Sequence, residues 1–515
     1  MKTSFVTTMK DFDLAMDSPA SKTEFILKTS LLLIPFFCLR ALELIFAATP
    51  ITLNLVFLPG VERLRWRSGK MKMYIRSFFA RVNTPAYREF VQRESSSDNI
   101  PVMDKENYVK KFSIDDRCKG GAIPVKGTVI DESSGSTGVP ANWVRGKKER
   151  RKNQRLMKMS LDRIMGCKDY MILNSFALGP WATGMNVSEA FSTRGIVKSP
   201  GPDIPKIINT LKLFGKERTY AIMGYPPFLK ALADSTEIDW KEYNVVFVHG
   251  GEAMSAGMVE YLLEKGIRRT VSSFGASDLE LNIGTETGFT FQLRRRIAKD
   301  KKWQEAFLQF GGQIPMIFQY NPSDFFIETN KENELIVTLC RGGYACPKIR
   351  YNIHDKGHIL RVRELKKILH SLDSSIEELG GSETDLPLLF HYGRADQSLA
   401  WYGCKISPAH IIDTVYSTNM IADIFSAFTM RTTENEKLDK QLEIFIELNE
   451  ATKKETIDVE QLASLFLTTL REHNQDFRES SRLAPTAAQP KVIFENAKEG
   501  LFAEKDIRLK MKYIQ

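Results

Sequence analysis

Short apolar runs alternate with amphipathic stretches along most of the chain from about residue 75. Residues 244–250 (NVVFVHG) and 269–275 (RTVSSFG) are apolar runs that end at glycine, as buried strands do. Residues 258–266 (MVEYLLEKG) between them form an amphipathic pattern that Gly266 closes, which predicts a helix. A strand, a helix and a strand at this spacing predict a βαβ unit, and hence a largely parallel sheet with ligands at the carboxyl ends of its strands.

The pattern changes twice further along. Residues 324–340 are expected to form two strands joined by a polar turn, as in a small barrel or hairpin subdomain. Residues 427–448 predict a second hairpin with a charged turn, and residues 457–473 a helix. We therefore expect an α/β protein, with a large N-terminal domain over 75–394 and a small α+β C-terminal domain over 395–515.

The N-terminal residues 1–74 are set apart by the apolar stretch 24–58. A membrane span needs about 20 uninterrupted apolar residues. Charged Arg40 and Glu43 interrupt this stretch and Pro50 breaks its helical pattern, so a segment lying in the membrane interface fits better than a span. The alternative is a helical pair buried against the main domain. We expect peripheral contact with the cytoplasmic face of a membrane, because a basic run follows at 61–76.

Composition and charge narrow the function classes. The chain of 515 residues carries a formal net charge of +9, with one dense basic cluster at 147–155. No nucleic-acid-binding motif accompanies these charges, so a solvated helix face is the expectation and nucleic acid is not an expected partner. The six cysteines are too sparse for a disulfide framework, which favours reduced thiols in a cytoplasmic protein.

Candidate chemistry starts at residues 131–140 (DESSGSTGVP), a run of small and hydroxyl residues whose backbone N–H groups can converge on a phosphate. It is no Walker loop, because no lysine follows the last glycine. Four more segments follow in order: FGASDLE (274–280), PKIRYNIHDKG (347–357), YGRADQSLAWYGCKISP (392–408) and EKDIR (504–508).

The ordered set resembles the acyl-adenylate-forming (AMP-binding) superfamily, and within it the phenylacetate–CoA ligase-like branch. Members carry SSGTTG, YG(x)(S/T)E, PLIRYRTGD, GR(x)DD…G(x)…P and GKxxR in this order. The resemblance spans roughly residues 75–508. It implies a large adenylating domain of parallel sheets with a barrel-like subdomain, a small mobile C-terminal domain, and the use of ATP, Mg²⁺ and coenzyme A.

The resemblance also implies roles for individual residues. The β- and γ-phosphates of ATP are expected at Ser133, Ser134, Gly135, Ser136, Thr137 and Gly138. The adenine and the acyl pocket are expected along Phe274, Gly275, Ala276 and Ser277, with the same nucleotide edge lined by Gly250, Gly251 and Glu252. The ribose and phosphate contacts are expected from Asp355, Arg350 and Arg394. The remaining roles are those of Lys505 as the adenylation cation, Asp396 as the hinge and Asp278 as the Mg²⁺ ligand.

This sequence departs from the family pattern at several of these positions. Position 141 is Ala rather than Lys, Asp278 replaces the usual glutamate, and Glu504 replaces a glycine. With the shorter Asp278, a water, Glu280 or Glu286 is expected to complete the metal site.

The reaction expected from the resemblance is activation of an aryl or fatty acid as acyl-AMP, followed by transfer to a thiol, coenzyme A. The acyl pocket is expected at 174–184 and 225–228. Two alternatives stay open. One is an adenylating ligase with an amine or hydroxyl acceptor, and the other is a catalytically silent, membrane-associated member of the family.

Overall fold

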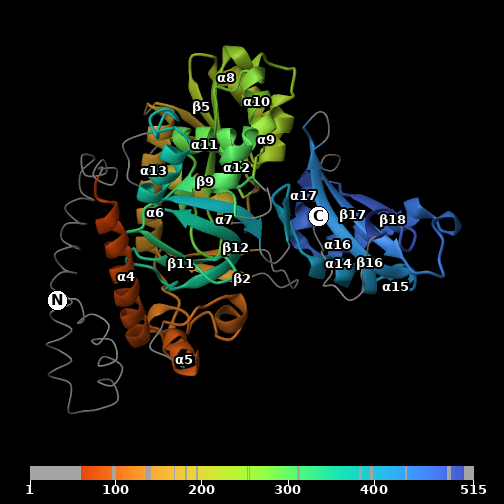
Figure 1. Cartoon of the computed structure of the whole chain (residues 1–515), viewed down its shortest axis with the longest axis horizontal. Helices are drawn as coiled ribbons and strands as arrows, with labels where there is room; N and C mark the ends of the chain where they lie inside the picture. Colours follow the sequence, from red (N-terminus) through yellow and green to blue (C-terminus); the bar gives the residue numbers. More distant parts are fainter. Residues whose placement is uncertain are drawn as a thin grey trace.

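An 11-stranded mixed sheet organises the larger of two bodies in the computed structural model (Figure 1). The structure describes residues 60–94, 100–133, 141–167, 169–179, 182–192, 195–251, 253–254, 256–309, 314–381, 386–394, 398–434, 438–483 and 489–503. The apolar stretch 24–58 lies outside these residues. Among the residues that are described, no helix combines the length and the apolar character needed to cross a bilayer.

One half of the sheet is parallel, and helices cover both of its faces. Tyr220 and Ile222 of one strand pack against the first helical layer, whereas Ala221 between them packs against the second. This alternation is expected of a strand buried on both faces. The predicted βαβ unit is confirmed as β6, α10 and β7. The strands, in sheet order, are β4 (Ile196–Lys198), β3 (Met171–Asn174), β5 (Thr219–Gly224), β6 (Asn244–Gly250) and β7 (Arg269–Phe274). The first layer contains α8 (Ile204–Phe214), α9 (Pro226–Ala233) and α10 (Ala256–Lys265), and the second contains α6 (Lys147–Met165) and α7 (Ala182–Ser192).

The other half of the sheet is antiparallel. The hairpin predicted over 324–340 forms, and its strands are the antiparallel end of the large sheet rather than a separate small sheet. The sheet is continuous because Thr285 pairs with Ser273 on one side and with Gln319 on the other. The strands, in sheet order from β7, are β8 (Gly284–Thr285), β9 (Met316–Gln319), β13 (Leu388–Arg394), β12 (Tyr351–Leu360), β11 (Glu334–Leu339) and β10 (Phe325–Thr329).

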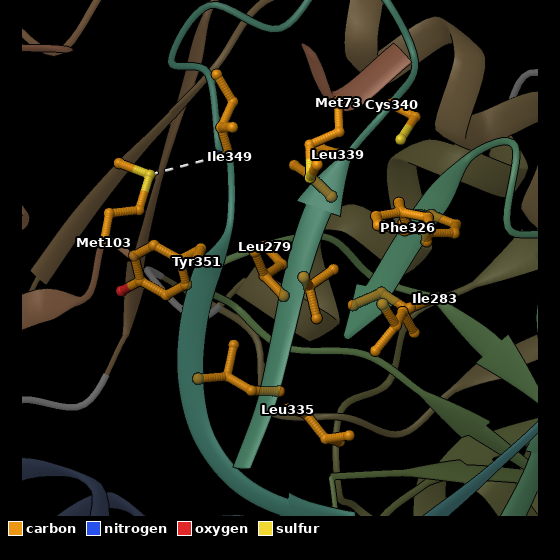
Figure 2. Close-up of a cluster of buried hydrophobic side chains, with 14 of the residues drawn as sticks. Met73, Met103, Leu279, Ile283, Phe326, Leu335, Leu339, Cys340, Ile349 and Tyr351 are labelled. Atoms are coloured by element: carbon orange, nitrogen blue, oxygen red, sulfur yellow. Dashed lines mark hydrogen bonds between the residues drawn. The ribbon is translucent and has the colours of Figure 1, made fainter. Parts of the chain in front are cut away.

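Two N-terminal helices, α4 (Glu62–Asn83) and α5 (Pro85–Glu94), pack on this antiparallel end. A Cβ atom on Gly69 would lie 2.1 Å from the carbonyl oxygen of Pro322, so α4 approaches the sheet at van der Waals distance. Figure 2 shows Met73 of α4 beside Leu339 and Cys340. Helix α4 runs without a break through the predicted boundary at 74/75, and so belongs to the packing of the large body.

The basic side chains of this N-terminal region take part in that packing. Lys72 Nζ donates to the carbonyl oxygen of Ser323 at 3.1 Å, and Arg76 Nε to that of Cys340 at 3.0 Å. The basic cluster at 147–155 lies on α6, where Arg150 pairs with Glu189. Lys147, Lys148, Arg151 and Arg155 are exposed on this helix, as expected of a solvated face.

The remaining elements of the large body connect these layers. They are β1 (Val129–Ser133), β2 (Ala141–Arg145), α11 (Gly288–Lys299), α12 (Lys301–Phe307), α13 (Val362–Ser371), the π-helix η3 (Lys105–Val109) and the 3₁₀ turns η4 (Lys119–Gly121) and η5 (Trp240–Glu242).

The smaller body has its own core and contains the second predicted hairpin and helix. Ser407 caps a helix that begins at Pro408, and Asp458 caps the predicted helix, both by accepting a backbone N–H three residues on. Its elements are β14 (Leu399–Trp401), β15 (Cys404–Ile406), α14 (Pro408–Tyr416), α15 (Asn419–Ala422), β16 (Phe425–Glu434), β17 (Lys440–Leu448), η6 (Lys454–Thr456), α16 (Val459–His473), α17 (Gln475–Leu483), β18 (Lys491–Glu495) and η7 (Gly500–Phe502). The two bodies touch where Lys230 pairs with Asp439.

Candidate active site

Asp355 is the centre of a buried polar group on β12 and β13. The antiparallel register places Asp355 opposite Arg394. Arg394 Nη1 donates to Asp355 Oδ1 at 3.1 Å and to the carbonyl oxygen of Ile353 at 2.6 Å. His391 Nε2 lies 2.9 Å from Asp355 Oδ2. Of the expected nucleotide residues, the structure thus brings Asp355 and Arg394 together, and it adds His391.

Electrostatics keep this carboxylate ionised. Burial raises the pKa of the Asp355 carboxyl group, but the hydrogen bond and charge of His391, with the charges of Arg394 and Lys405, outweigh burial and hold that pKa below its ordinary value. An ionised carboxylate only accepts hydrogen bonds, which suits it to hydroxyl groups such as those of a ribose. Lys405 belongs to β15, so the smaller body contributes positive charge to the group.

The expected adenine edge lies beside this group. Phe274 ends β7, and its ring centroid lies 4.8 Å from that of His391 and 5.5 Å from that of Phe318. The chain turns sharply after Phe274, since a Cβ atom on Gly275 would lie 2.9 Å from the Cα atom of Leu281. Only a glycine fits this turn without displacing backbone.

Arg145 holds that turn in place. It lies on β2, which directly follows the expected phosphate loop, and pairs with Asp131 at 3.1 Å. Its guanidinium group also donates to the carbonyl oxygens of Ser277 and Leu279. Strands β1 and β2, which flank the expected phosphate loop in sequence, are therefore fixed to the turn after β7.

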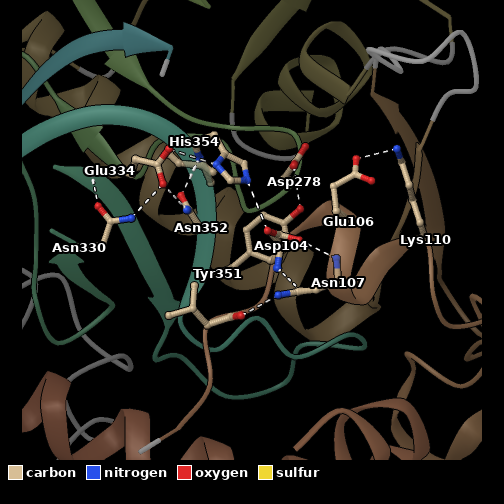
Figure 3. Close-up of polar contacts among 12 residues, drawn as sticks. Asp104, Glu106, Asn107, Lys110, Asp278, Asn330, Glu334, Tyr351, Asn352 and His354 are labelled. Carbon is tan, nitrogen blue, oxygen red and sulfur yellow. Dashed lines mark hydrogen bonds and ion pairs between the residues drawn. The ribbon is translucent and has the colours of Figure 1, made fainter. Parts of the chain in front are cut away.

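Asp278 lies in the same turn and is engaged on both carboxylate oxygens. Lys105 Nζ lies 3.2 Å from Oδ1. The Tyr351 hydroxyl group donates to Oδ2 at 2.9 Å (Figure 3). Burial raises the pKa of Asp278, but the charges of Lys105 and Lys405 and the Tyr351 hydrogen bond outweigh burial and lower it.

The contacts of the candidate carboxylates do not fit a magnesium site. Mg²⁺ binds oxygen ligands at about 2.1 Å in octahedral geometry, whereas Asp278 already holds an ammonium group. Glu280 pairs with Arg341 and accepts from Tyr344, and Glu286 pairs with Arg294. Within the described ranges no three His, Cys, Asp or Glu side chains form a metal-binding group. The role of Asp278 as a Mg²⁺ ligand stays a prediction, and these contacts do not favour it.

A cavity of about 150 Å³ lies between the two bodies, next to this turn. Tyr225, which begins the second predicted stretch of the acyl pocket, packs between Gly251 and Gly403. Cβ atoms on these two glycines would lie 2.9 and 2.4 Å from its ring, and both have a φ near +80° (81° and 78°). The cavity is lined by Glu132, Ala177, Ala182, Thr183, Pro202, Tyr225, Phe228, Ser277, Tyr402, Gly403, Asp476, Glu479, Ser480 and Leu483. It therefore contains members of both stretches expected to form the acyl pocket.

Arg350 makes different contacts from those expected. Its guanidinium group pairs with Glu328 at 3.1 Å and donates to the carbonyl oxygen of Ile100. These contacts tie β12 to β10 and to the N-terminal region. Arg350 therefore supports the sheet end in this structure, and the Asp355 group is completed by Arg394 and His391 instead.

Several predicted site residues lie outside the described residues, and their roles stay predictions: Ser134, Gly135, Ser136, Thr137, Gly138, Glu252, Asp396 and Lys505. Gly250, at the end of β6, is described, and a Cβ atom there would lie 2.9 Å from the carbonyl oxygen of Ser273. Ala276 hydrogen-bonds to Glu280 through its backbone.

The side chains in direct contact with the two aspartates that were not predicted include His391, Lys105 and Tyr351. His391 lies three residues before Arg394, on the strand that pairs with the strand of Asp355. This strand pairing would indicate that His391 lies near Asp355. Tyr351 lies four residues before Asp355 on the same strand. Lys105 comes from a distant part of the chain and has no such signal.

Comparison with protein-family models finds no match, and comparison with curated proteins finds none. Among solved structures, 2-hydroxyisobutyryl-CoA ligase in complex with 2-HIB-AMP and CoA, in the thioesterification state, matches with a TM-score of 0.60. Their sequences are 13% identical, and the match covers 89% of this chain and 90% of that one. The amide bond synthetase McbA from Marinactinospora thermotolerans has 11% identity, a TM-score of 0.47, and coverage of 79% and 74%. The o-succinylbenzoate CoA synthetase MenE from Bacillus subtilis has 13% identity, a TM-score of 0.43, and coverage of 71% and 65%.

The match to the 2-hydroxyisobutyryl-CoA ligase decides the fold. The alignment to the 2-hydroxyisobutyryl-CoA ligase includes both bodies of this chain, since it covers nine tenths of it. The predicted α/β class is confirmed, and the resemblance to the AMP-binding superfamily is confirmed at the level of fold. The phenylacetate–CoA ligase-like branch stays a prediction. The chain has the two-domain fold of the acyl-adenylate-forming ligases.

Proposed function

We propose that this protein activates a carboxylic acid with ATP as an acyl-AMP and then transfers the acyl group to a thiol, coenzyme A. The observation that carries the proposal is the Asp355–His391–Arg394 group beside Phe274. It presents an ionised acceptor and an aromatic edge at one place in a chain with an adenylating fold.

In the first step a carboxylate oxygen attacks the α-phosphorus, and the bond from that phosphorus to pyrophosphate breaks. Both reactants are anions, so the protein contributes mainly positioning and positive charge. Asp355 accepts the ribose hydroxyl groups, and Phe274 lies along the adenine. The loop 133–138 holds the β- and γ-phosphates, and Lys505 bridges the carboxylate and the α-phosphate.

In the second step the acceptor attacks the acyl carbon, and the bond from carbon to the AMP oxygen breaks. Asp396 is the proposed hinge for a rotation of the smaller body between the steps. Support for a thiol acceptor comes from the 2-hydroxyisobutyryl-CoA ligase, which holds CoA together with its adenylate. The aromatic side chains Tyr225 and Phe228 of the cavity suit an aryl or fatty acid.

An amine acceptor is the second candidate, and one feature of the cavity favours it. Glu132, Asp476 and Glu479 line the cavity beside the rings of Tyr225 and Tyr402. Carboxylates and aromatic faces attract an ammonium group and repel the phosphates of CoA. The experiment that identifies the acceptor supplies CoA and then an amine to the protein with ATP and the acid. A thiol acceptor gives a thioester with CoA, and an amine acceptor gives an amide and no thioester.

The test of adenylation is exchange of labelled pyrophosphate into ATP, with Mg²⁺ and a panel of aryl and fatty acids. We expect acid-dependent exchange in the wild type and its loss in Lys505→Ala. Lys510→Ala is the matched control in the same basic terminus and should exchange normally. ATP binding without exchange, for every acid tested, would contradict the proposal and favour a catalytically silent protein.

A further inference from the structure

The segment that contains Lys105 is fixed to strand β12 through Met103. Met103 forms a parallel bridge with Tyr351. Its N–H donates to the carbonyl oxygen of Arg350 at 3.1 Å, and its carbonyl oxygen accepts from Asn352 at 2.8 Å. Its sulfur atom accepts the N–H of Ile349 at 3.3 Å (Figure 2). Because Met103 is fully buried, the backbone next to Lys105 has a fixed position on the sheet.

Asp104 fixes the other side of this position. Its carboxylate accepts the N–H of Asn107 at 2.7 Å, while the Asn107 side chain accepts the N–H of Asp104 at 2.8 Å. This reciprocal pair caps the π-helix η3, which begins at Lys105. Asp104 also lies 3.5 Å from His354 Nε2, and His354 in turn lies 3.3 Å from Glu334 (Figure 3). The first residue of η3 is thus attached to β12 by both backbone and side-chain contacts.

Lys105 projects from this anchored position onto Asp278. Its Nζ atom lies 3.2 Å from Asp278 Oδ1, with the lysine side chain 27% exposed and the aspartate side chain 15% exposed. The Lys105 Nζ atom lies 5.9 Å from the ring centroid of Trp143, and Lys348 Nζ lies 3.9 Å from the same centroid. Two lysine side chains therefore share one aromatic ring next to Asp278.

This arrangement leaves little room for a divalent ion bound by Asp278. One oxygen holds Lys105 and the other holds the Tyr351 hydroxyl group. A metal ion would displace the ammonium group of Lys105 and then be repelled by that group at short range. The neighbouring carboxylates Glu280 and Glu286 are committed to arginines.

We infer that Lys105 takes the place of a protein-bound divalent ion: its ammonium group, held by Asp278, supplies positive charge to the phosphates of the bound nucleotide. The inference rests on the proposed function, which assigns those phosphates to the loop between β1 and β2. Arg145 of β2 donates to the carbonyl oxygens of Ser277 and Leu279, on either side of Asp278. A lysine suits the role as a compact point charge with several donors. Asp278 and Tyr351 are then positioning residues for Lys105. Mg²⁺ reaches the site only as part of the nucleotide.

The first experiment measures ATP binding to the full chain by calorimetry in EDTA, without any divalent ion. We expect the wild type to bind ATP and Lys105→Met to bind about tenfold more weakly, as for the loss of one charge-assisted contact. Lys105→Arg keeps the charge and should retain most of the affinity. Lys110→Met is the matched control, because Lys110 lies on the same segment but pairs with exposed Glu106; it should bind like the wild type.

Equal affinity of Lys105→Met and the wild type would overturn the inference while leaving adenylation intact. A wild type that binds no ATP under any condition, with or without Mg²⁺, would overturn the proposed function and this inference with it. A Lys105→Met variant that fails to fold is recognised by circular dichroism, and the comparison then rests on Lys105→Arg and on the metal measurement.

The second experiment titrates Mn²⁺ alone into the protein and follows free Mn²⁺ by electron paramagnetic resonance. We expect the wild type and Asp278→Asn to bind Mn²⁺ equally weakly, because Asp278 holds an ammonium group. Lys105→Met should bind Mn²⁺ more tightly than the wild type, since it frees the carboxylate. A wild-type site that Asp278→Asn abolishes would contradict the inference directly.

Discussion

Asp355 is buried and Asp278 is partly exposed, and the two aspartates are held in different ways. The partners of Asp355, His391 and Arg394, lie on the adjacent strand of the same sheet. The ammonium partner of Asp278 comes from a segment more than 170 residues away in sequence (278 − 105 = 173), docked through Met103. The first arrangement follows from strand register, whereas the second depends on tertiary docking. Substitutions should therefore affect the two groups differently.

The largest expected effect is that of Asp355→Asn. It leaves Arg394 and His391 beside a neutral amide in a buried position, and we expect the free energy of unfolding to fall by about 3 kcal/mol and AMP binding to be lost. Asp278→Asn is the comparison, with a fall of about 1–2 kcal/mol because water can reach the partly exposed Lys105. Urea denaturation and AMP titration of both variants measure this; equal losses would mean that the two groups do not differ.

His391→Ala should come next, with AMP affinity about tenfold lower. The variant removes one partner of Asp355 and the ring beside Phe274. His358→Ala is the matched control, because His358 lies on the adjacent strand β12 and stacks on Phe390 with ring centroids 4.4 Å apart. Both variants should lose stability, but only His391→Ala should lose AMP affinity. A similar affinity loss in both would assign the effect to the sheet rather than to the Asp355 group.

Tyr351→Phe tests the Asp278 group more gently. Removing the hydroxyl group deletes one hydrogen bond to Asp278 Oδ2, so we expect a loss of about 1 kcal/mol in unfolding free energy. The pKa of Asp278 should rise, because that hydrogen bond helps to lower it. Carboxyl-detected NMR titration measures the pKa; an unchanged value would show that the neighbouring lysine charges, and not this hydrogen bond, lower it.

The smallest expected effect is a pH dependence from His354. Its hydrogen bond to Asp104, with that to Glu334, raises the pKa of His354 against the opposing effect of burial. The raised pKa means that its contribution is complete below about pH 6.5, the ordinary histidine pKa, and is lost as the pH rises through the higher folded-state value. The contribution should be under about 1 kcal/mol, because the ring is about one-third exposed.

The measurement is the difference in unfolding free energy between the wild type and His354→Gln at pH 5.5 and pH 8.5. The difference should be larger at pH 5.5. A difference that grows towards pH 8.5 would show that the neutral ring, not the protonated ring, makes the stabilising contacts with Asp104 and Glu334.

Much of the fold could be predicted from local patterns. Apolar spacing and closing glycines are local features of the sequence. They predicted the strand at 244–250, the helix at 258–266 and the hairpin at 427–448. The place of the hairpin at 324–340 was less accessible, because a strand pattern does not reveal which sheet the strand joins. That was decided by the short strand β8, whose two residues link the parallel and antiparallel halves.

The site divides in the same way. Asp355, Arg394 and Phe274 were predicted through ordered motifs, and the structure brings them together around His391. Arg350 was predicted through its motif as well, but its guanidinium group pairs with Glu328 and donates to the carbonyl oxygen of Ile100. Both partners lie outside the motif, so the motif alone did not indicate these contacts. Lys105 could not be predicted from the sequence, because no local pattern indicates that residue 105 contacts residue 278.

The most direct test of the central claim, that the chain makes an acyl-AMP, follows one oxygen atom. An acid that supports pyrophosphate exchange is prepared with ¹⁸O in its carboxylate and turned over with ATP and an acceptor, and the released AMP is analysed by mass spectrometry. We predict one ¹⁸O atom in each AMP, because the carboxylate oxygen that attacks the α-phosphorus leaves with it. Unlabelled AMP, or ADP as the product, would contradict acyl adenylation.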